Sequence, residues 1–147
     1  MSTDGNLSAI FQAHMKEAHW QRIESTSTGM GMPDLEYCFP GGDQGWIEMK
    51  TTSAFRVEIR PHQIAWLERR RRAQGRAFVA VRRKSSPGPR KGASDDSLWL
   101  FDGLQARALA TERVDKVPRL GYWPGGPAKW GWSEVRAILI ARSSDKE

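Results

Sequence analysis

The chain of 147 residues lacks several features that mark secreted, membrane-bound or zinc-binding proteins. Its single cysteine, Cys38, excludes an internal disulfide and a zinc site built from several cysteines. The chain has no run of about 18 apolar residues, and its first residues, MSTDGNLSAI, lack the basic and apolar regions of a signal peptide. We therefore expect a cytoplasmic protein that does not enter a membrane, with Cys38 buried in a strand.

Several catalytic motifs are also missing. The three histidines form no HExxH pattern, which argues against that class of zinc peptidase. There is no GxxxxGK(S/T) phosphate-binding loop, so an ATP-driven motor is not indicated. No serine lies in a GxSxG turn, and the sequence does not predict a serine hydrolase of that class.

Acidic residues are absent from residues 69–91, although the whole chain holds 17 of them. The same segment carries ten of the 23 lysines and arginines, so the remainder of the chain has a net negative charge. Clustered arginine is typical of proteins that bind the phosphate backbone of nucleic acids. A solvated helix face followed by a basic loop would give the same composition, and acidic proteins and membrane surfaces also attract basic patches. The candidates for contacts with nucleic acid are Arg69, Arg70, Arg72, Arg82, Arg83 and Lys84.

The spacing of the apolar residues predicts helices and strands in a defined order. We expect a helix over residues 7–19, an extended segment at WQRIES, strands at DLEYCF and WIEMKT, a helix over residues 61–74 and a strand at RAFVAVRR. The PGGDQG segment has the composition of a hairpin connection, so DLEYCF and WIEMKT should pair antiparallel. The helix before RAFVAVRR permits a crossover connection. The predicted fold class is α/β, with a central mixed β-sheet flanked by helices.

The C-terminal third has a less regular pattern, and we interpret residues 1–147 as one domain. Residues 84–96 have the composition of a surface loop. SLWLF predicts a strand, residues 102–114 predict a helix, PRLGYWPGGPAKWGW is irregular, and SEVRAILIARS predicts a last helix capped by Ser133. The tryptophans gathered in this part of the chain are more typical of core packing than of stacking on bases.

Two acids and a lysine are predicted to converge at one end of the hairpin. Alternation along WIEMK places Trp46, Glu48 and Lys50 on one face of the strand. If the hairpin folds back as expected, Asp34 at the start of the preceding strand lies close to Lys50. Carboxylates are the ligands that Mg²⁺ prefers, and a cation there could polarise a phosphoryl oxygen. The alternative is an exposed Glu–Lys pair on a surface hairpin, which is a common arrangement.

The order of Pro33-Asp34, Glu48-x-Lys50 and then Gln63 on the following helix resembles the PD-(D/E)XK nuclease superfamily. Within it, the chain is similar to the small VRR-NUC and Holliday-junction-resolvase-like nucleases that phages often carry. The resemblance covers about residues 7–83 and leaves about residues 97–143 as a C-terminal extension. It implies a restriction-endonuclease-like core in the order helix, three strands, helix, strand.

The resemblance also implies roles for individual residues. Asp34, Glu48 and the backbone carbonyl of Met49 would bind Mg²⁺ or Mn²⁺, Lys50 would assist the attacking water, and Gln63 would contact the lysine or DNA. Many members add a glutamate from the first helix, and two residues compete for that position here. Glu17 continues the row of Ile10 and His14 on the first predicted helix. Glu24 lies just before the glycine-rich TSTGMGMP segment and nearer Asp34, and we favour it.

The sequence as a whole predicts a metal-dependent DNA endonuclease that acts in phage or bacterial DNA repair, recombination or processing. One alternative is a non-catalytic nucleic-acid-binding module with the same fold, and another is a basic domain that binds proteins. A nuclease specialised for four-way junctions must cut two opposed strands, and in that case a symmetric homodimer is expected.

Overall fold

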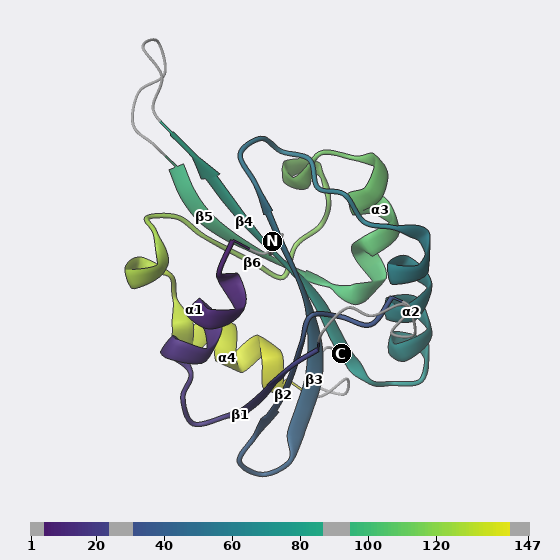
Figure 1. The fold of residues 1–147 in the computed structure, drawn as a ribbon, viewed down its shortest axis with the longest axis vertical. Coiled ribbons are helices and arrows are strands. Elements are labelled where there is room, and N and C mark those ends of the chain that lie inside the picture. Colours follow the sequence, from purple (N-terminus) through teal and green to yellow (C-terminus); the bar gives the residue numbers. More distant parts are fainter. Residues whose placement is uncertain (1–4, 24–30, 87–94, 142–147) are drawn as a thin grey trace.

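The computed structural model describes residues 5–23, 31–86 and 95–141. Its centre is a six-stranded sheet in which the strands follow one another in the order β1-β2-β3-β4-β5-β6 (Figure 1). The strands are β1 His19–Arg22, β2 Leu35–Phe39, β3 Asp43–Thr52, β4 Arg76–Ser85, β5 Asp95–Asp102 and β6 Gly121–Trp123. The α-helices are α1 Leu7–His14, α2 Pro61–Arg72, α3 Ala106–Thr111 and α4 Trp132–Ile140. The 3₁₀ helices are η1 Gly103–Gln105, η2 Val114–Lys116 and η3 Pro127–Lys129.

The predicted α/β class with a mixed sheet is confirmed, and α1 to β4 follow the predicted order of helix, three strands, helix and strand. The β3–β4 pair is parallel, whereas the other neighbouring strands pair antiparallel. The parallel pair requires a crossover, which α2 provides. The tight β2–β3 hairpin depends on Gly41 and Gly42, whose φ angles of 101° and 90° suit glycine.

Helices cover both faces of the sheet. Figure 1 shows α1 and α4 on one side of the strands and α2 and α3 on the other. On the first face, buried side chains of the helices pack against those of Leu35 and Met49. On the second face, Leu67 of α2 and Leu109 of α3 pack with Val79 of β4. The central part of β4 is buried on both faces, as its apolar sequence predicts. No helix within the described ranges is long and apolar enough to cross a membrane.

The first helix is shorter than the sequence indicates. It ends at His14, so the prediction of a helix over residues 7–19 is wrong beyond that residue. Met15 leaves the helical conformation with φ −136° and ψ 65°, and its carbonyl accepts a hydrogen bond of 2.8 Å from the indole nitrogen of Trp20. The side chain of Trp20 thus adds a second donor to a carbonyl that also accepts a hydrogen bond of 3.4 Å from the backbone N–H of Ala18.

The C-terminal third contains three differences from the prediction. The helix expected over residues 102–114 is divided into η1, α3 and η2, and the irregular aromatic segment contains the short strand β6. The last helix begins at Trp132 and has Gly131 as its N-cap, so the predicted cap at Ser133 is wrong. Glu134 in the first turn of α4 instead accepts a hydrogen bond of 2.6 Å from the indole of Trp123.

Burial agrees with the interpretation of the tryptophans. Trp99, Trp123 and Trp130 are all buried, which confirms their predicted role in packing. Cys38 lies on strand β2 as predicted, but it is half-buried, so the prediction that it is buried is wrong.

Candidate active site

The β2–β3 hairpin brings Asp34 beside Glu48. Leu35 pairs with Ile47 in the antiparallel register, which places Asp34, the residue before β2, level with Glu48. The Asp34 carboxylate accepts a hydrogen bond of 2.9 Å from the backbone N–H of Met49. The predicted convergence of the two acids is therefore present. Met49 contributes its backbone N–H to this arrangement. The metal-binding role of its carbonyl stays a prediction.

Glu48 is buried although it is an acid. Its exposed fraction is 2%. Oε2 accepts a hydrogen bond of 3.0 Å from Nε2 of Gln63 and lies 3.4 Å from Nζ of Lys50, whereas Oε1 has no hydrogen-bond partner among the described residues. Burial, followed by the negative charge of Asp34, raises the pKa of Glu48 to about 8, and the ammonium of Lys50 opposes this shift. One oxygen of the side chain is therefore buried without a hydrogen bond to the described residues.

Gln63 connects the acid, the lysine and the start of α2. Its Oε1 accepts hydrogen bonds from Nζ of Lys50 at 3.4 Å and from the backbone N–H of Arg60 at 2.9 Å. Its Nε2 donates to Glu48, so the amide holds both charged groups. The predicted contact between Gln63 and Lys50 is confirmed. Arg60 was not predicted, although the proline that follows it and the glutamine three residues later form a recognisable helix-start pattern.

Gly31 allows the segment before Asp34 to approach α2. Gly31 is buried with φ 80°, and a Cβ atom on it would overlap the backbone carbonyl of His62 in the first turn of the helix. A larger residue would therefore force the two segments apart. The first turn of α2 is therefore the backbone that Gly31 approaches.

The site provides ligands of the right type for a hard divalent cation. Asp34 and Glu48 contribute carboxylates, and Oε1 of Glu48 is a buried oxygen without another partner in the described part of the chain. Mg²⁺ is commonly bound by one or two carboxylates, with water and substrate phosphate as its other ligands. The described residues contain no cluster of three or more histidine, cysteine, aspartate or glutamate side chains suited to a metal. Asp34 and Glu48 are therefore the residues that could hold Mg²⁺ or Mn²⁺.

The structure places only one of the two glutamates that were candidates for a third acid of the site. Glu17 follows the end of α1, and its carboxylate accepts a hydrogen bond of 2.9 Å from Arg136 of α4. Because α4 packs on the sheet face opposite α2, the structure does not bring Glu17 to Asp34 and Glu48. The prediction that Glu17 is a helical metal ligand is therefore wrong. Glu24 lies outside the described residues.

The predicted basic segment is divided into two groups. Arg82 is buried and makes hydrogen bonds of 2.9 and 2.8 Å to both carboxylate oxygens of Asp96, while Arg83 lies 2.7 Å from Asp95. The prediction that Arg82 contacts nucleic acid is therefore wrong, because internal partners already engage its guanidinium. Arg83 is half-buried and is likewise paired, so the structure gives it no unpaired charge for phosphate. Lys84 is exposed.

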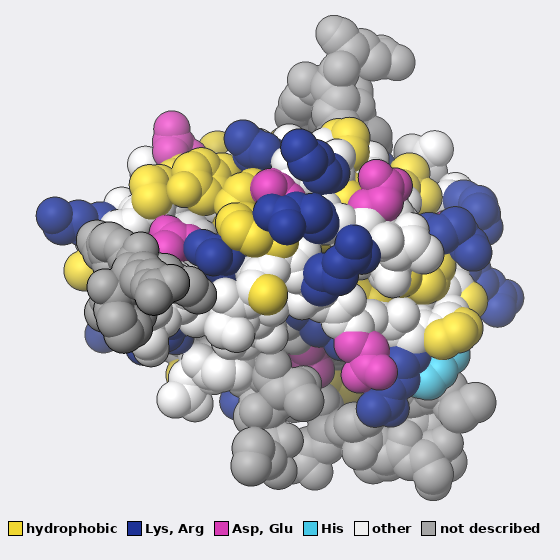
Figure 2. All heavy atoms as spheres, turned by 90° about the horizontal axis from the view of Figure 1, so that it is seen from above, with side chains coloured by type: hydrophobic (Ala, Val, Ile, Leu, Met, Phe, Trp, Pro, Cys, Tyr) yellow, Lys and Arg dark blue, Asp and Glu magenta, His cyan; other side chains and the backbone are white. Residues whose placement is uncertain are grey.

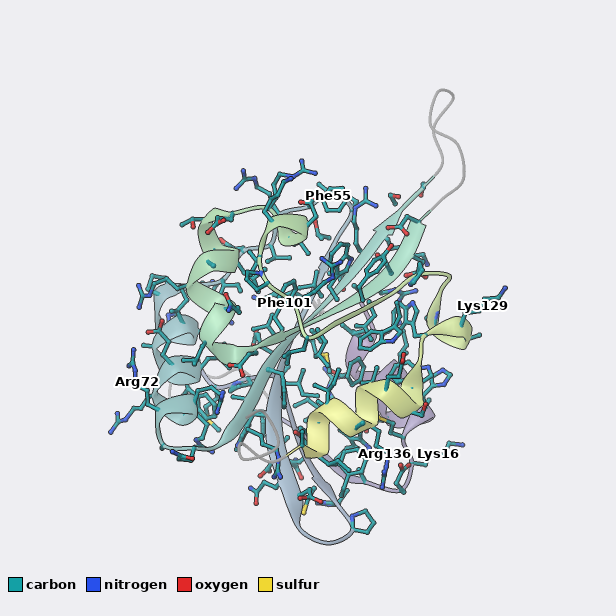
Figure 3. The ribbon with its side chains drawn as sticks, turned by 180° about the vertical axis from the view of Figure 1, so that it is seen from behind. Lys16, Phe55, Arg72, Phe101, Lys129 and Arg136 are labelled. Atoms are coloured by element: carbon teal, nitrogen blue, oxygen red, sulfur yellow. The ribbon has the colours of Figure 1, made fainter. Side chains whose placement is uncertain are left out.

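The second basic group lies on α2. Arg69 and Arg72 are exposed, and Arg72 points outward from the helix (Figure 3). Arg72 has a loose ion pair of 3.6 Å with Glu68, and Arg70 lies over the rings of two tryptophans. Figure 2 shows further Lys and Arg side chains gathered on one end of the molecule, with acids between them. Cations for a polyanion are therefore available on α2, although the segment does not form one continuous surface.

Comparison with known proteins leaves this geometry as the main guide to function. No protein-family model matches the chain, and no curated protein matches it. The likeness to PD-(D/E)XK nucleases consequently rests on the residues quoted above.

Proposed function

We propose that this protein is a metal-dependent DNA endonuclease that hydrolyses phosphodiester bonds during DNA repair, recombination or processing in the cytoplasm. The observation that carries the proposal is the buried carboxylate of Glu48 beside Asp34, Lys50 and Gln63, with Oε1 lacking a partner in the described residues. A buried acid with an unused oxygen is costly unless a ligand compensates it. A divalent cation is the ligand whose chemistry matches two neighbouring carboxylates.

Each residue of the site has a distinct task in this proposal. Asp34 and Glu48 would hold Mg²⁺ or Mn²⁺, and the bound cation would supply Lewis acidity at the phosphoryl group. Gln63 fixes the orientation of Glu48 through Nε2 and that of Lys50 through Oε1. The Lys50 ammonium, held in this way, orients the attacking water or stabilises the negative charge that develops on the phosphate.

The exposed cations of α2 support DNA as the substrate. Arg69 and Arg72 would contact phosphates on the outside of the helix that carries Gln63. Such contacts release counterions, so affinity for DNA is expected to fall steeply as the salt concentration rises. Lys84, exposed on β4, would extend the same electrostatic attraction.

A cleavage panel tests the proposal. Linear, nicked, flapped and four-way-junction DNA would be incubated with Mg²⁺, Mn²⁺ or EDTA, and the products separated on denaturing gels. We expect cutting with either cation and none in EDTA. Lys50→Ala should slow cutting by about 10²- to 10³-fold, the typical loss when one group that stabilises transition-state charge is removed.

Lys129→Ala is the matched control, because Lys129 is an exposed lysine on η3 that points away from the molecule (Figure 3). It should cut at the wild-type rate. In the contrary outcome, the protein binds DNA in a salt-sensitive way that metal does not change, and it cuts none of the substrates. That result would contradict the nuclease and favour a non-catalytic DNA-binding module. If four-way junctions are the preferred substrate, sedimentation should also show a homodimer, because two strands must be cut.

A further inference from the structure

A hollow of about 390 Å³ lies where the start of β3 meets the C-terminal end of α2. Its volume falls within the range of small-ligand sites. No acidic residue lines it, and its lining includes Trp46, Arg70 and Arg76. A second hollow of about 380 Å³ on α2 is lined by Trp66, Arg69, Arg70 and Ala73. Arg70 is common to both hollows, so the two are adjacent.

The side chains around Arg70 combine aromatic rings with a positive charge. The guanidinium carbon lies 4.5 Å from the ring centre of Trp66 and 5.4 Å from that of Trp46, and the two rings meet edge to face at 5.2 Å. Trp66 is half-buried, so part of its ring remains accessible. The indole nitrogen of Trp46 is buried and has no hydrogen-bond partner in the described part of the chain. Aromatic rings next to arginine are the groups that stack on bases and contact phosphates in single-stranded nucleic acid.

The hollow lies on the same side of the sheet as the candidate active site. Alternation along β3 puts Trp46 and Glu48 on one face, separated by about 7 Å along the strand. On α2, Gln63 and Arg70 are two helical turns apart and share one side of the helix. Gln63 contacts Glu48 at one end, and Arg70 contacts Trp46 at the other. If a phosphate of a DNA strand lies at the candidate active site beside Glu48, the adjacent nucleotide would therefore lie near Arg70.

We propose that the two hollows at Arg70 bind an unpaired nucleotide of the substrate strand, next to the phosphodiester bond that is cut. The base would stack on Trp66 and Arg70, and Arg69 would contact a phosphate. A base in a duplex is already stacked and paired, and its face is not available for such a contact. The substrate class is accordingly DNA with a single-stranded segment, such as a flap or a frayed end. This inference rests on the proposed nuclease function.

Binding in EDTA tests the site without any need for cleavage. A fluorescent oligothymidylate and a blunt duplex of the same length would be titrated with the full-length protein, and fluorescence anisotropy recorded. We expect the wild type to prefer the oligothymidylate. Arg70→Met keeps an unbranched side chain over the tryptophans but removes the charge, and it should weaken oligothymidylate binding about tenfold, as expected for the loss of one stacked base.

Trp66→Leu should have a similar effect, and its melting curve shows independently whether α2 remains folded. Arg136→Met is the matched control, because Arg136 also lies over an aromatic ring, 5.3 Å from that of Phe39, but it belongs to α4 on the other face of the sheet. This control should bind oligothymidylate like the wild type. An equal loss in Arg136→Met would mean that only net charge matters and would overturn the inference.

The results also separate this inference from the proposed function. If the wild type cuts DNA with Mg²⁺ while folded Arg70→Met and Trp66→Leu bind oligothymidylate like the wild type, the nucleotide site is rejected and the nuclease stands. If the wild type never cuts, but its preference for unpaired DNA is lost in both variants, the nucleotide site stands and the nuclease is rejected. Preference of the wild type for the blunt duplex would also reject the nucleotide site.

Discussion

Two contacts between an acid and a cation lie on opposite faces of the same sheet, and they differ in how completely the acid is satisfied. Arg82 and Asp96, on the face covered by α1 and α4, share two hydrogen bonds that use both carboxylate oxygens. Glu48 and Lys50, on the face covered by α2, lie 3.4 Å apart, and Oε1 of Glu48 has no partner in the described residues. In the first contact both carboxylate oxygens are hydrogen-bonded, whereas in the second one carboxylate oxygen could still bind a ligand.

The pKa shifts follow the same division. The hydrogen bonds with Asp96 raise the pKa of Arg82, so this pairing favours the charged guanidinium. The pKa of Glu48 rises to about 8, so its surroundings disfavour the charged carboxylate even with Lys50 nearby. An ion pair that only stabilises the fold favours both charges. We therefore interpret Arg82–Asp96 as structural and Glu48–Lys50 as part of a functional site.

The largest expected effects come from removing one partner of each pair and measuring the free energy of unfolding with urea, in EDTA, at pH 5.5 and 8.5. Between the ordinary pKa of 4.5 and about 8, folded Glu48 binds a proton that the unfolded chain has released, so stability falls as pH rises. Glu48→Gln removes this dependence and should be more stable than the wild type at pH 8.5, by on the order of 2 kcal/mol.

Arg82→Met should do the opposite, because it leaves Asp96 without its partner. We expect a loss of about 2 kcal/mol at both pH values, less than for a fully buried pair because the Asp96 side chain is 21% exposed. If Glu48→Gln destabilises the protein at pH 8.5 as much as Arg82→Met does, the distinction between the two pairs is wrong.

A somewhat smaller effect is expected from the cation itself. Mg²⁺ at saturating concentration should raise the melting temperature by about 5 °C at pH 8.5, since a ligand that binds only the folded state stabilises it. At pH 6 the rise should be smaller, because protonated Glu48 competes with the cation. Asp34→Asn, which keeps an oxygen for the N–H of Met49, should lose the response, as measured by differential scanning fluorimetry. An unchanged response in this variant would exclude Asp34 as a ligand.

The smallest effect is expected at Gln63, which acts through its neighbours. Gln63→Met removes the hydrogen bonds to Glu48, Lys50 and the N–H of Arg60, and should lower kcat/KM for cleavage about tenfold and the melting temperature by a few degrees, because Glu48 loses a donor and α2 loses part of its cap. Its pH–rate profile should shift as well, since Glu48 loses a donor to its carboxylate. Gln12→Met, a half-buried glutamine on α1 at the opposite face, should leave both readouts unchanged. A tenfold loss without a shifted profile would indicate a structural role only.

The parts of the site that the sequence predicts correctly depend on local rules. Strand alternation and a glycine-rich turn suffice to place Asp34, Glu48 and Lys50 on one face, because both act over a few residues. The position of Gln63 follows from the proline that marks the start of α2. The same local rules predict the hairpin, the crossover and the mixed sheet.

Contacts between distant segments account for the errors. Glu17 was one of two candidates for the third carboxylate, on the basis of helical spacing, but its partner Arg136 is 119 residues away and belongs to the last helix. Arg82 was assigned to nucleic acid from charge alone, but the β4–β5 pairing places it against Asp96. The strand β6 has only three residues, too few for an alternating pattern. No periodicity in the sequence encodes these pairings.

The single helix α2 joins the two ends of the proposed substrate path. Gln63 and Arg70 are about 10 Å apart along its axis, at a rise of 1.5 Å per residue. Because one helix carries both residues, a tilt of α2 at Arg70 would also displace Gln63 and, through its hydrogen bonds, Glu48 and Lys50. Binding of the strand at Arg70 and the positions of Glu48 and Lys50 therefore depend on the same helix. A strand that does not contact Arg70 would leave the carboxylate and the ammonium less well aligned.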